Sequence, residues 1–582
     1  MSNSSSATAI DPLTLGVVWR GLVSAANDAG MTLQRTAYSE AVREGRDFSV
    51  GLFDHQARMI VQGDFSPGHL GSMPSAVKHV LDYYPLEDLH PGDAIMLNDH
   101  WMGSGHLPDF FLCTPIFDDA GIVGYSVCCV HMIDVGGAVP GSQAVAGIND
   151  HYQEGIRFLP TRVWSAGEPN QEILRTLGAN VRVPDKLLGD LKAMRNCNRI
   201  GEQRVLEIVQ RFGREVYESA CDEILLQSEQ AMRKSLADIP DGVYHAVDHF
   251  DDYGPGTDPL RIEVTVTVAR DEITIDFEGS SPQTKSGING IANYVRAFCL
   301  FVVKAVTHGA SLPQNAGSIA PIHWKAPEGS VVNAQPPAGA GARAIMQQRF
   351  VDALMQALAP ALPGRVIAPS THWANPIAGG LDPRTGRRFV FYDIIVGGFG
   401  GRPAKDGTEA MCPSFNIDGI PTEINEHSYP VLVERYELIR DSAGPGRWRG
   451  GHGIRKDTRL MGDEMQLSNL TDRQHFPPPG ILGGLSGPLG ATVLDPGTDR
   501  ERRIHSKGTY DVPNGTVVSS RLSGSGGYGP PHERDVALVV ADVRQGLISR
   551  RHAADVYGVV ITPEGELDEA ATAHARAAAA HT

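Results

Sequence analysis

Two copies of the pattern His-x-x-Asp lie close together within residues 98–142. They are His106 with Asp109, and His131 with Asp134. Each copy adjoins glycines and an apolar run, FFLCTPIF or GYSVCCV, that is typical of a strand. Residues at a strand end face a defined direction, and glycines let backbone and ligand approach closely. If the two imidazoles and two carboxylates converge, they form a ligand set that suits a divalent cation such as zinc, manganese or iron.

A simpler interpretation of each copy is a loop in which the aspartate orients its histidine through a hydrogen bond. A single copy would favour this interpretation. Two copies on either side of one predicted hairpin favour a shared metal site. The spacing alone leaves both interpretations open.

Two further polar residues lie at the ends of predicted elements. Asp47 stands at the entrance of a strand in REGRDFSVGLFDHQARMIVQGD, a predicted hairpin, where a turn-forming aspartate would bond to its own backbone. His69 lies in SPGHLGSMPSAVKHVL, a glycine-rich turn that leads into a helix. We take His69 and Asp134 as candidate catalytic residues. Asp134 is expected to orient an imidazole and raise its basicity.

The elements that must position these residues favour a mixed α+β, multi-domain fold. Residues 1–237 are expected to form an N-terminal α/β domain that carries the metal site, and their segment from about 183 to 236 has helical spacing of apolar residues. Residues 238–379 begin with alternating, β-branched segments that predict antiparallel sheet and then return to helical spacing. Residues 380–582 predict a glycine-rich β domain of many short strands that ends in helices.

The composition indicates a globular protein with several cores. A chain of 582 residues, with 41% hydrophobic and 20% charged residues, is expected to form two to four domains. No apolar run is long enough to predict a membrane span, and the net charge of −17 argues against nucleic acid as a partner. The start lacks a secretory pattern, and seven cysteines without a C-x-x-C pair favour buried thiols in the cytoplasm.

Three common nucleotide or hydrolase motifs are missing. The segment GSSPQTKS fails as a P-loop because Thr284 stands where the phosphate cradle needs glycine before Lys285. The glycines at 397, 398, 400 and 401 lack the third glycine of a dinucleotide fingerprint, and Pro403 stands there instead. No G-x-S-x-G occurs, so a serine hydrolase with a nucleophile elbow is not expected. The His/Asp cluster is therefore the best candidate site.

Many blocks, in order and nearly from end to end, resemble the hydantoinase B/oxoprolinase family. They include EGRDFSVGLFD, PGHLGSMP, GDAIMLNDHWMGSGHLPDFFLCTPIF, HMIDVGGAVPGS, PQNAGSIAPIHWKAPEGSVVNAQPPAGAGAR, DSAGPGRWRGGHGIRK and SGSGGYGPPHERD. The resemblance implies that a divalent metal is held by His106, Asp109 and His131, with Asp47 as a further ligand. The sequence departs from the family at NDHW, where relatives often have an Asn-Asp-Pro-Tyr type of segment, so the detail of the pocket wall is not carried over.

The resemblance also implies a reaction and a partner. ATP and Mg²⁺ would be held by a hydantoinase A-type chain, in a heterotetramer of two plus two chains. That partner would phosphorylate the amide oxygen of a hydantoin, 5-oxoproline or lactam, and this chain would then help to open the ring. The alternative is a subunit of an ATP-dependent ketone carboxylase of the acetone or acetophenone type. A third hypothesis, a non-catalytic scaffold for the nucleotide-binding partner, leaves the His/Asp cluster without a role.

Overall fold

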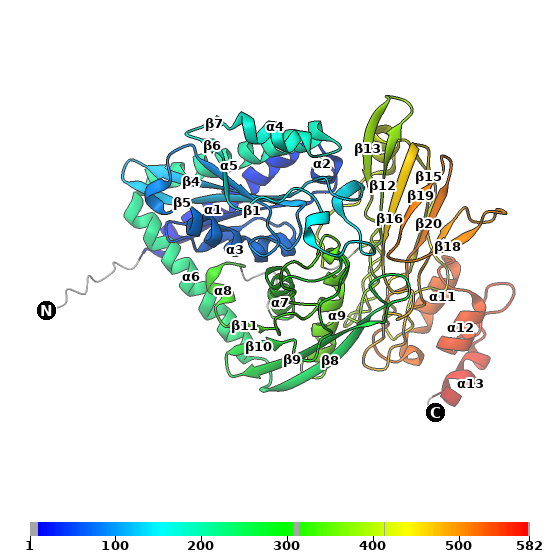
Figure 1. Ribbon diagram of the computed structural model, residues 1–582. Coiled ribbons are helices and arrows are strands. Elements are labelled where there is room, and N and C mark those ends of the chain that lie inside the picture. The colour runs from blue at the N-terminus through cyan, green and yellow to red at the C-terminus, as the bar shows by residue number, and fades with distance from the viewer. Residues whose placement is uncertain (1–9, 308–312, 412–413, 580–582) are drawn as a thin grey trace.

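The computed structural model describes residues 10–307, 313–411 and 414–579. Figure 1 shows the N-terminal and middle regions side by side with a C-terminal pair of sheets, and the last helices form a small separate group at the C-terminal end. The strands of the described residues form four sheets. Within the described residues, no helix has the combination of length and apolar character needed to cross a membrane.

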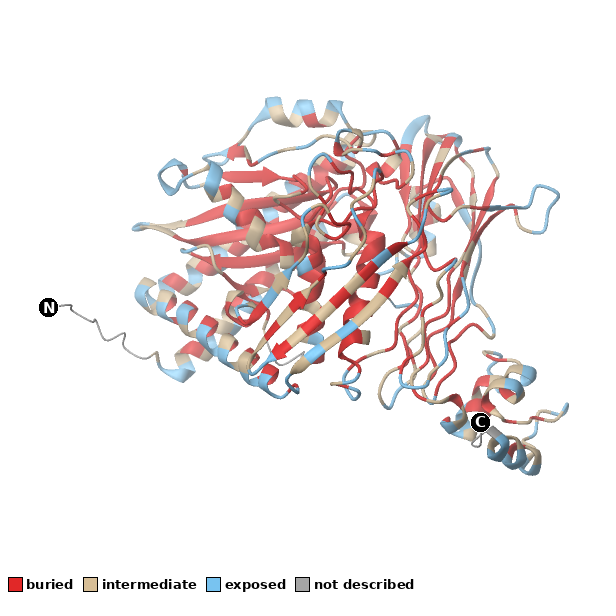
Figure 2. Cartoon of the chain, turned by 60° about the horizontal axis from the view of Figure 1, so that its bottom comes forward, coloured by how far each residue is buried: buried red, intermediate tan, exposed pale blue. Residues whose placement is uncertain are grey.

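The N-terminal region is built around a seven-stranded antiparallel sheet in the order β2-β1-β5-β4-β3-β6-β7. Its strands are β1 (Phe48–Asp54), β2 (Met59–Gln62), β3 (Ala94–Leu97), β4 (Asp109–Asp118), β5 (Gly121–His131), β6 (Thr161–Ser165) and β7 (Glu168–Pro169). The central strands β1, β3, β4 and β5 are almost wholly buried, as Figure 2 shows, because helices cover both faces.

The helices of this region are α1 (Pro12–Thr36), α2 (Glu40–Arg43), α3 (Pro67–Tyr83), α4 (Gln171–Ala179), α5 (Pro184–Phe212) and α6 (Arg214–Ala237). Asp11 caps α1 by accepting the N–H of Thr14 at 2.9 Å. Helices α1 and α5 pack together on one face of the sheet. Gly201 lets α5 approach β5 closely, because a Cβ there would lie 2.2 Å from Ser126 Oγ. Helix α3 covers the other face, where Met73 packs against Gly51 of β1.

The middle region contains a four-stranded sheet in the order β11-β10-β9-β8. Its elements are β8 (Gly242–Phe250), β9 (Leu260–Ala269), β10 (Glu272–Asp276), α7 (Ala292–Val306), α8 (Ala316–Ile319), β11 (Ile322–Lys325) and α9 (Gln347–Leu358). The predicted antiparallel sheet is confirmed for β8, β9 and β10, but β11 joins β10 in parallel. The reason is the crossover through α7, which returns the chain to the same end of the sheet.

The C-terminal region contains two sheets, in the orders β13-β12-β16-β19 and β14-β15-β20-β17-β18. Their elements are β12 (Asn375–Asp382), β13 (Arg387–Tyr392), α10 (Thr422–Ser428), β14 (Val431–Leu438), β15 (Ile454–Leu460), β16 (Asp463–Leu470), β17 (Ala491–Leu494), β18 (Arg502–Ile504), β19 (Thr509–Val512) and β20 (Val517–Arg521). One apolar cluster takes residues from both sheets, so the sheets pack face to face as a sandwich. The final helices α11 (Val536–Arg544), α12 (Arg550–Tyr557) and α13 (Glu569–Ala579) follow, and α11 and α12 share a small core of their own.

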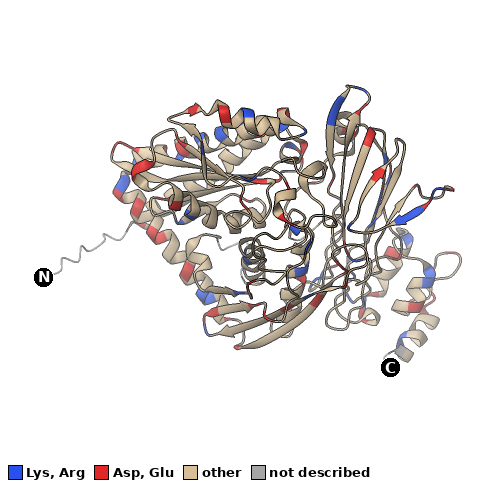
Figure 3. Ribbon diagram, viewed as in Figure 1, with Lys and Arg blue, Asp and Glu red and all other residues tan. Residues whose placement is uncertain are grey.

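The predicted mixed, multi-domain fold is confirmed by these separate sheets and their helices. The expected division after residue 237 falls between α6 and β8, whereas the one after residue 379 falls inside β12. Acidic and basic side chains are interspersed over the elements (Figure 3). Six of the seven cysteines are buried free thiols, and Cys412 lies outside the described residues.

Candidate metal centre

The hairpin of β4 and β5 brings the two His-x-x-Asp segments together. Asp109 is the first residue of β4 and His131 is the last residue of β5, and the two are cross-strand partners. Directly opposed residues have their side chains on the same face of a sheet, about 5 Å apart. His106 precedes Asp109 by one short turn, in which the N–H of Asp109 reaches the carbonyl of His106. Local strand pairing therefore places both imidazoles beside one carboxylate.

The two imidazoles converge on one oxygen of Asp109. His106 Nε2 lies 2.8 Å from Asp109 Oδ1, and His131 Nδ1 lies 3.0 Å from the same oxygen. All three side chains are buried. Within the described chain, they form one of the two groups whose ligand atoms all lie within 4.8 Å of one another.

The opposite nitrogen of each ring has its own partner. His106 Nδ1 donates to the carbonyl of Gly341 at 2.9 Å, which leaves Nε2 with a lone pair directed at Asp109. His131 Nε2 lies 3.3 Å from the amide of Gln143. The amide nitrogen of Gln143 faces the ring, and its Oε1 has no hydrogen-bond partner among the described residues. If the amide is rotated by 180°, Gln143 Oε1 can accept an N–H at Nε2 of His131. The lone pair of Nδ1 then faces Asp109.

The donor set fits a divalent cation. Burial and the nearby charge of Arg343 outweigh the attraction of Asp109 and lower the pKa of His106 to about 3, so the ring is neutral at physiological pH. A neutral ring that donates through Nδ1 has no proton left between Nε2 and the carboxylate oxygen 2.8 Å away. Facing lone pairs repel, and a cation between them removes the repulsion. Two imidazole nitrogens and one carboxylate oxygen are a set suited to zinc, manganese or iron.

The second oxygen of Asp109 is held from the middle region of the chain. Arg343 Nη2 donates to Oδ2 at 2.6 Å, and the hydroxyl of Ser104 donates to the same oxygen. Burial alone would raise the pKa of Asp109, but the surrounding charges, including that of Arg343, outweigh it and hold the pKa well below its ordinary value. The carboxylate is therefore kept ionised and in a fixed orientation.

The other group of close ligand atoms is His69, Asp109 and Cys129. In this group, His69 Nε2 lies 3.3 Å from Oδ2 of Asp109. The guanidinium of Arg343 already occupies this side and would repel a cation. Burial and the carboxylates of Asp109 and Asp47 raise the pKa of the Cys129 thiol well above its usual value. The group of His106, Asp109 and His131 is therefore the better candidate for a metal centre.

His69 and Asp47 lie beside the triad. His69, in the first turn of α3, is 3.3 Å from Asp109 and its Nε2 lies 3.9 Å from Asp47 Oδ1. Burial lowers the pKa of His69, but the two carboxylates outweigh burial and raise it. Burial raises the pKa of Asp47 despite the nearby histidines. The carboxylate of Asp47 belongs to neither group of mutually close ligand atoms, so the structure brings it to the edge of the centre and not into the triad.

Asp134 has other partners than the imidazoles. Its carboxylate accepts the N–H groups of Gly136, Gly141 and Arg182, and it also pairs with the Arg182 side chain at 2.9 Å. The reason is the sharp turn after Asp134, where Gly136 and Gly137 have φ of 88° and 77°. These contacts are with backbone N–H groups and Arg182, and the role of Asp134 in orienting a histidine stays a prediction. Its contacts close the loop that follows β5.

We predict that Asp134→Asn keeps its metal and loses stability. The change removes the charge that faces Arg182, at an expected cost of about 1 to 3 kcal/mol in the free energy of unfolding. Thermal unfolding and elemental analysis of the purified variant measure the two effects. Loss of metal from a variant that remains folded would show that Asp134 does act on the centre.

Several groups around the centre had no local signal in the sequence. Arg343 and Gly341 come from the middle region, and Tyr392 of β13 places its ring 5.0 Å from that of His131. Gln143 lies in the loop after β5. The blocks HMIDVGGAVPGS and PPAGAGAR, which carry the family resemblance, end at or near Gln143 and Arg343, and this was the one available hint.

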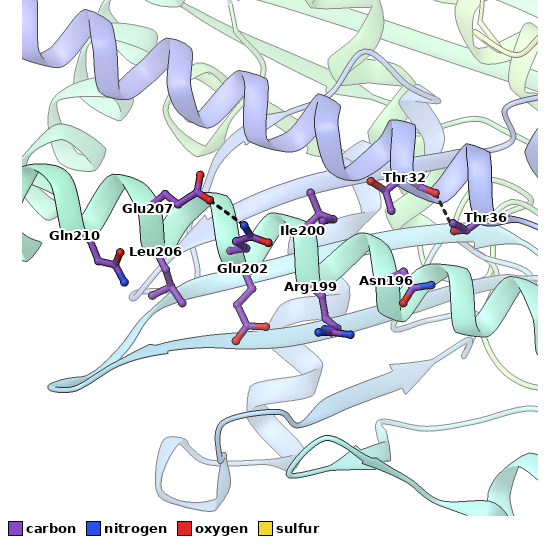
Figure 4. A pocket seen from close by; sticks show the side chains of 10 residues that line it. Thr32, Thr36, Asn196, Arg199, Ile200, Glu202, Leu206, Glu207 and Gln210 are labelled. Carbon is purple, nitrogen blue, oxygen red and sulfur yellow. Dashed lines mark hydrogen bonds between the residues drawn. The ribbon is translucent and has the colours of Figure 1, made fainter.

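A hollow elsewhere on the surface is a separate feature. It lies between α1 and α5, encloses about 770 Å³ and is drawn in Figure 4. Its Glu207 is already paired with Gln203 at 2.9 Å, and the hollow contains no residue of the candidate centre. We assign no chemistry to it.

Comparison with known proteins identifies the family. The family model described as hydantoinase B/oxoprolinase matches residues 11–531. The chain belongs to the hydantoinase B/oxoprolinase family. The predicted resemblance is confirmed.

Members of the hydantoinase B/oxoprolinase family resemble this chain over nearly its whole length. A putative D-/L-hydantoinase B-type subunit from Pseudomonas sp. (strain NS671) is 33% identical over 96% of this chain and 97% of its own. The crystal structure of ATP-dependent caprolactamase from Pseudomonas jessenii is 31% identical, has a TM-score of 0.90 and covers 98% of this chain and 100% of its own. A nucleotide-free acetone carboxylase structure, 20% identical with a TM-score of 0.88, covers 98% of this chain and 83% of its own and shares the fold.

Proposed function

We propose that this chain is the metal-carrying subunit of an ATP-dependent hydrolase that opens cyclic amides. The observation that carries the proposal is the shared carboxylate of Asp109, which faces two imidazole nitrogens on one oxygen and Arg343 on the other. The hydantoinase and caprolactamase relatives act on rings of this class by name, which supports the substrate class. The chemistry that a divalent cation supplies there is activation of water and polarisation of an oxygen.

The chain's own residues have distinct tasks in this proposal. Asp109, His106 and His131 would hold the cation, and Arg343 keeps Asp109 ionised and oriented. His69, whose Nε2 lies 3.3 Å from Asp109, is the side chain proposed to deliver a proton to the departing ring nitrogen. Because these side chains are buried, the site excludes bulk water from an activated amide.

ATP is assigned to a partner. An unstrained amide resists hydrolysis because its resonance must be broken and its nitrogen is a poor leaving group. Phosphorylation of the amide oxygen would make the carbonyl carbon a good electrophile. The sequence lacks a P-loop, and the hydantoinase relative is named as one subunit of its enzyme. We therefore propose that ATP and Mg²⁺ are held by a hydantoinase A-type partner, which joins this chain in a heterotetramer of two plus two.

Reconstitution with that partner tests the proposed function. We expect this chain alone to show neither ATP hydrolysis nor ring opening, and the mixed complex to hydrolyse ATP only when a ring substrate is present. The assay compares hydantoins, 5-oxoproline and larger lactams with ketones plus bicarbonate. Consumption of a ketone that depends on bicarbonate, with no cyclic amide opened, would contradict the hydrolase and establish the carboxylase alternative.

A further inference from the structure

The orientation of the His106 ring depends on a carbonyl from a distant part of the chain. The Gly341 carbonyl accepts from Nδ1 across a separation of 235 residues. This one contact sets which ring nitrogen keeps its lone pair for a cation. Whatever fixes the backbone at Gly341 therefore controls the donor atom of His106.

The backbone at Gly341 is fixed by the carboxylate of Glu154. Glu154 Oε1 accepts the N–H of Ala340 at 2.7 Å and that of Gly341 at 2.6 Å. The other oxygen, Oε2, accepts from His100 Nε2 at 2.6 Å. Glu154 is 2% exposed and His100 is fully buried, so these bonds are not exchanged with solvent.

The close approach of the two segments favours glycine. A Cβ on Gly341 would lie 3.1 Å from Glu154 Cδ and 3.0 Å from the carbonyl of Ser142. A Cβ on Gly339 would lie 3.1 Å from Glu154 Oε1. The turn around Gly341 is thus built to seat a carboxylate against its N–H groups.

The same turn carries the second contact to the centre. Arg343 follows Gly341 by two residues and donates to Asp109 Oδ2 and to the carbonyl of Ser104. A shift of the turn would move the partner of His106 and the partner of Asp109 together. Glu154 thus anchors the segment that orients two of the three proposed ligands.

We propose that Glu154, itself oriented by His100, is a positioning residue for the metal centre. It acts through the 340–341 backbone on His106 and, through Arg343, on Asp109. It touches neither ligand directly, because its hydrogen bonds are to His100, Ala340 and Gly341. This inference rests on the proposed metal site of His106, Asp109 and His131.

The test uses the full chain and compares four variants with the wild type. Glu154→Ala removes the anchor, and Glu154→Gln keeps one oxygen that can accept both N–H groups. His100→Ala removes only the group that orients the carboxylate. Glu168→Gln, at an exposed position of β7, is the matched control. Competition with a chelator measures the dissociation constants for Zn²⁺ and Mn²⁺.

We expect Glu154→Ala to weaken metal binding by about ten- to a hundredfold, as loss of a group that orients a ligand does. Glu154→Gln should recover most of the affinity, His100→Ala should give an intermediate loss, and Glu168→Gln should match the wild type. A second readout needs no metal. Selective ¹⁵N labelling of histidine should show His106 protonated on Nδ1 in the metal-free wild type, and a mixture of tautomers in Glu154→Ala.

The outcomes separate positioning from a merely structural role. Unchanged metal affinity and an unchanged His106 tautomer in a folded Glu154→Ala chain would overturn the inference. If that variant fails to fold, His100→Ala decides, because a loss of metal affinity there supports the inference and an unchanged affinity counts against it. A wild-type chain that binds no metal would instead refute the proposed function, so the two failures are distinguishable.

Discussion

Replacing His106 or His131 by alanine is expected to leave a folded chain without its metal. Each substitution removes one of two imidazoles that face a single oxygen of Asp109. Loss of a group that only orients a ligand costs about ten- to a hundredfold in affinity, so loss of the ligand itself should exceed about a hundredfold. Elemental analysis after gel filtration measures the metal, and circular dichroism checks the fold. Ring opening by the reconstituted complex should fall with the metal content.

The matched control is His245→Ala, which removes a half-exposed histidine of β8. It should keep the full metal content. Full metal in both His106→Ala and His131→Ala would refute the assignment. Loss in one variant only would direct attention to the neighbouring His69 and Asp47 as a replacement ligand.

Removing the metal from the reconstituted complex is expected to separate ATP turnover from ring opening. Phosphorylation is assigned to the partner, whereas water activation is assigned to the centre on this chain. A metal typically supplies several kcal/mol of stabilisation to such a step, so ring opening should fall by at least about a hundredfold. Substrate-dependent release of phosphate should continue. Parallel assays of phosphate and of the opened product measure the two activities.

Adding back the metal should restore ring opening, and the same treatment of the His106→Ala complex should not. If phosphate release and ring opening disappear together on metal removal, the cation serves the phosphorylation step and the proposed division of labour fails. This result would leave the family and the fold untouched, because neither depends on the chemistry.

The part of the centre that lies within one hairpin was predictable from the sequence. Asp109 and His131 flank two apolar runs, and pairing of those runs brings the two residues opposite each other. His106 follows because it lies one short turn from Asp109. Such contacts depend on local periodicity, which a single sequence displays directly.

The remaining contacts were not predictable because they depend on how distant regions dock. Arg343 reaches Asp109 across 234 residues, and no pattern near either residue indicates the pair. Asp134 shows how one motif can have different surroundings. Its motif matches that of Asp109, yet the left-handed glycines that follow turn the chain so that the carboxylate meets backbone N–H groups and Arg182. The parallel pairing of β11 was not predicted, because the sequence of a strand does not indicate whether a crossover helix precedes it.

The long separation between His106 and Gly341 has a consequence for biosynthesis. A chain leaves the ribosome from its N-terminus, at about 5 to 20 residues per second, and domains fold as they emerge. The hairpin that carries Asp109 and His131 is complete long before the turn at Gly341 and Arg343 exists. Until that turn is made, His106 lacks the carbonyl that fixes its tautomer and Asp109 lacks the guanidinium of Arg343. Under the proposed function, a metal ion captured by the nascent chain would therefore be held loosely and open to exchange, and the final ion would be selected only after the turn has formed.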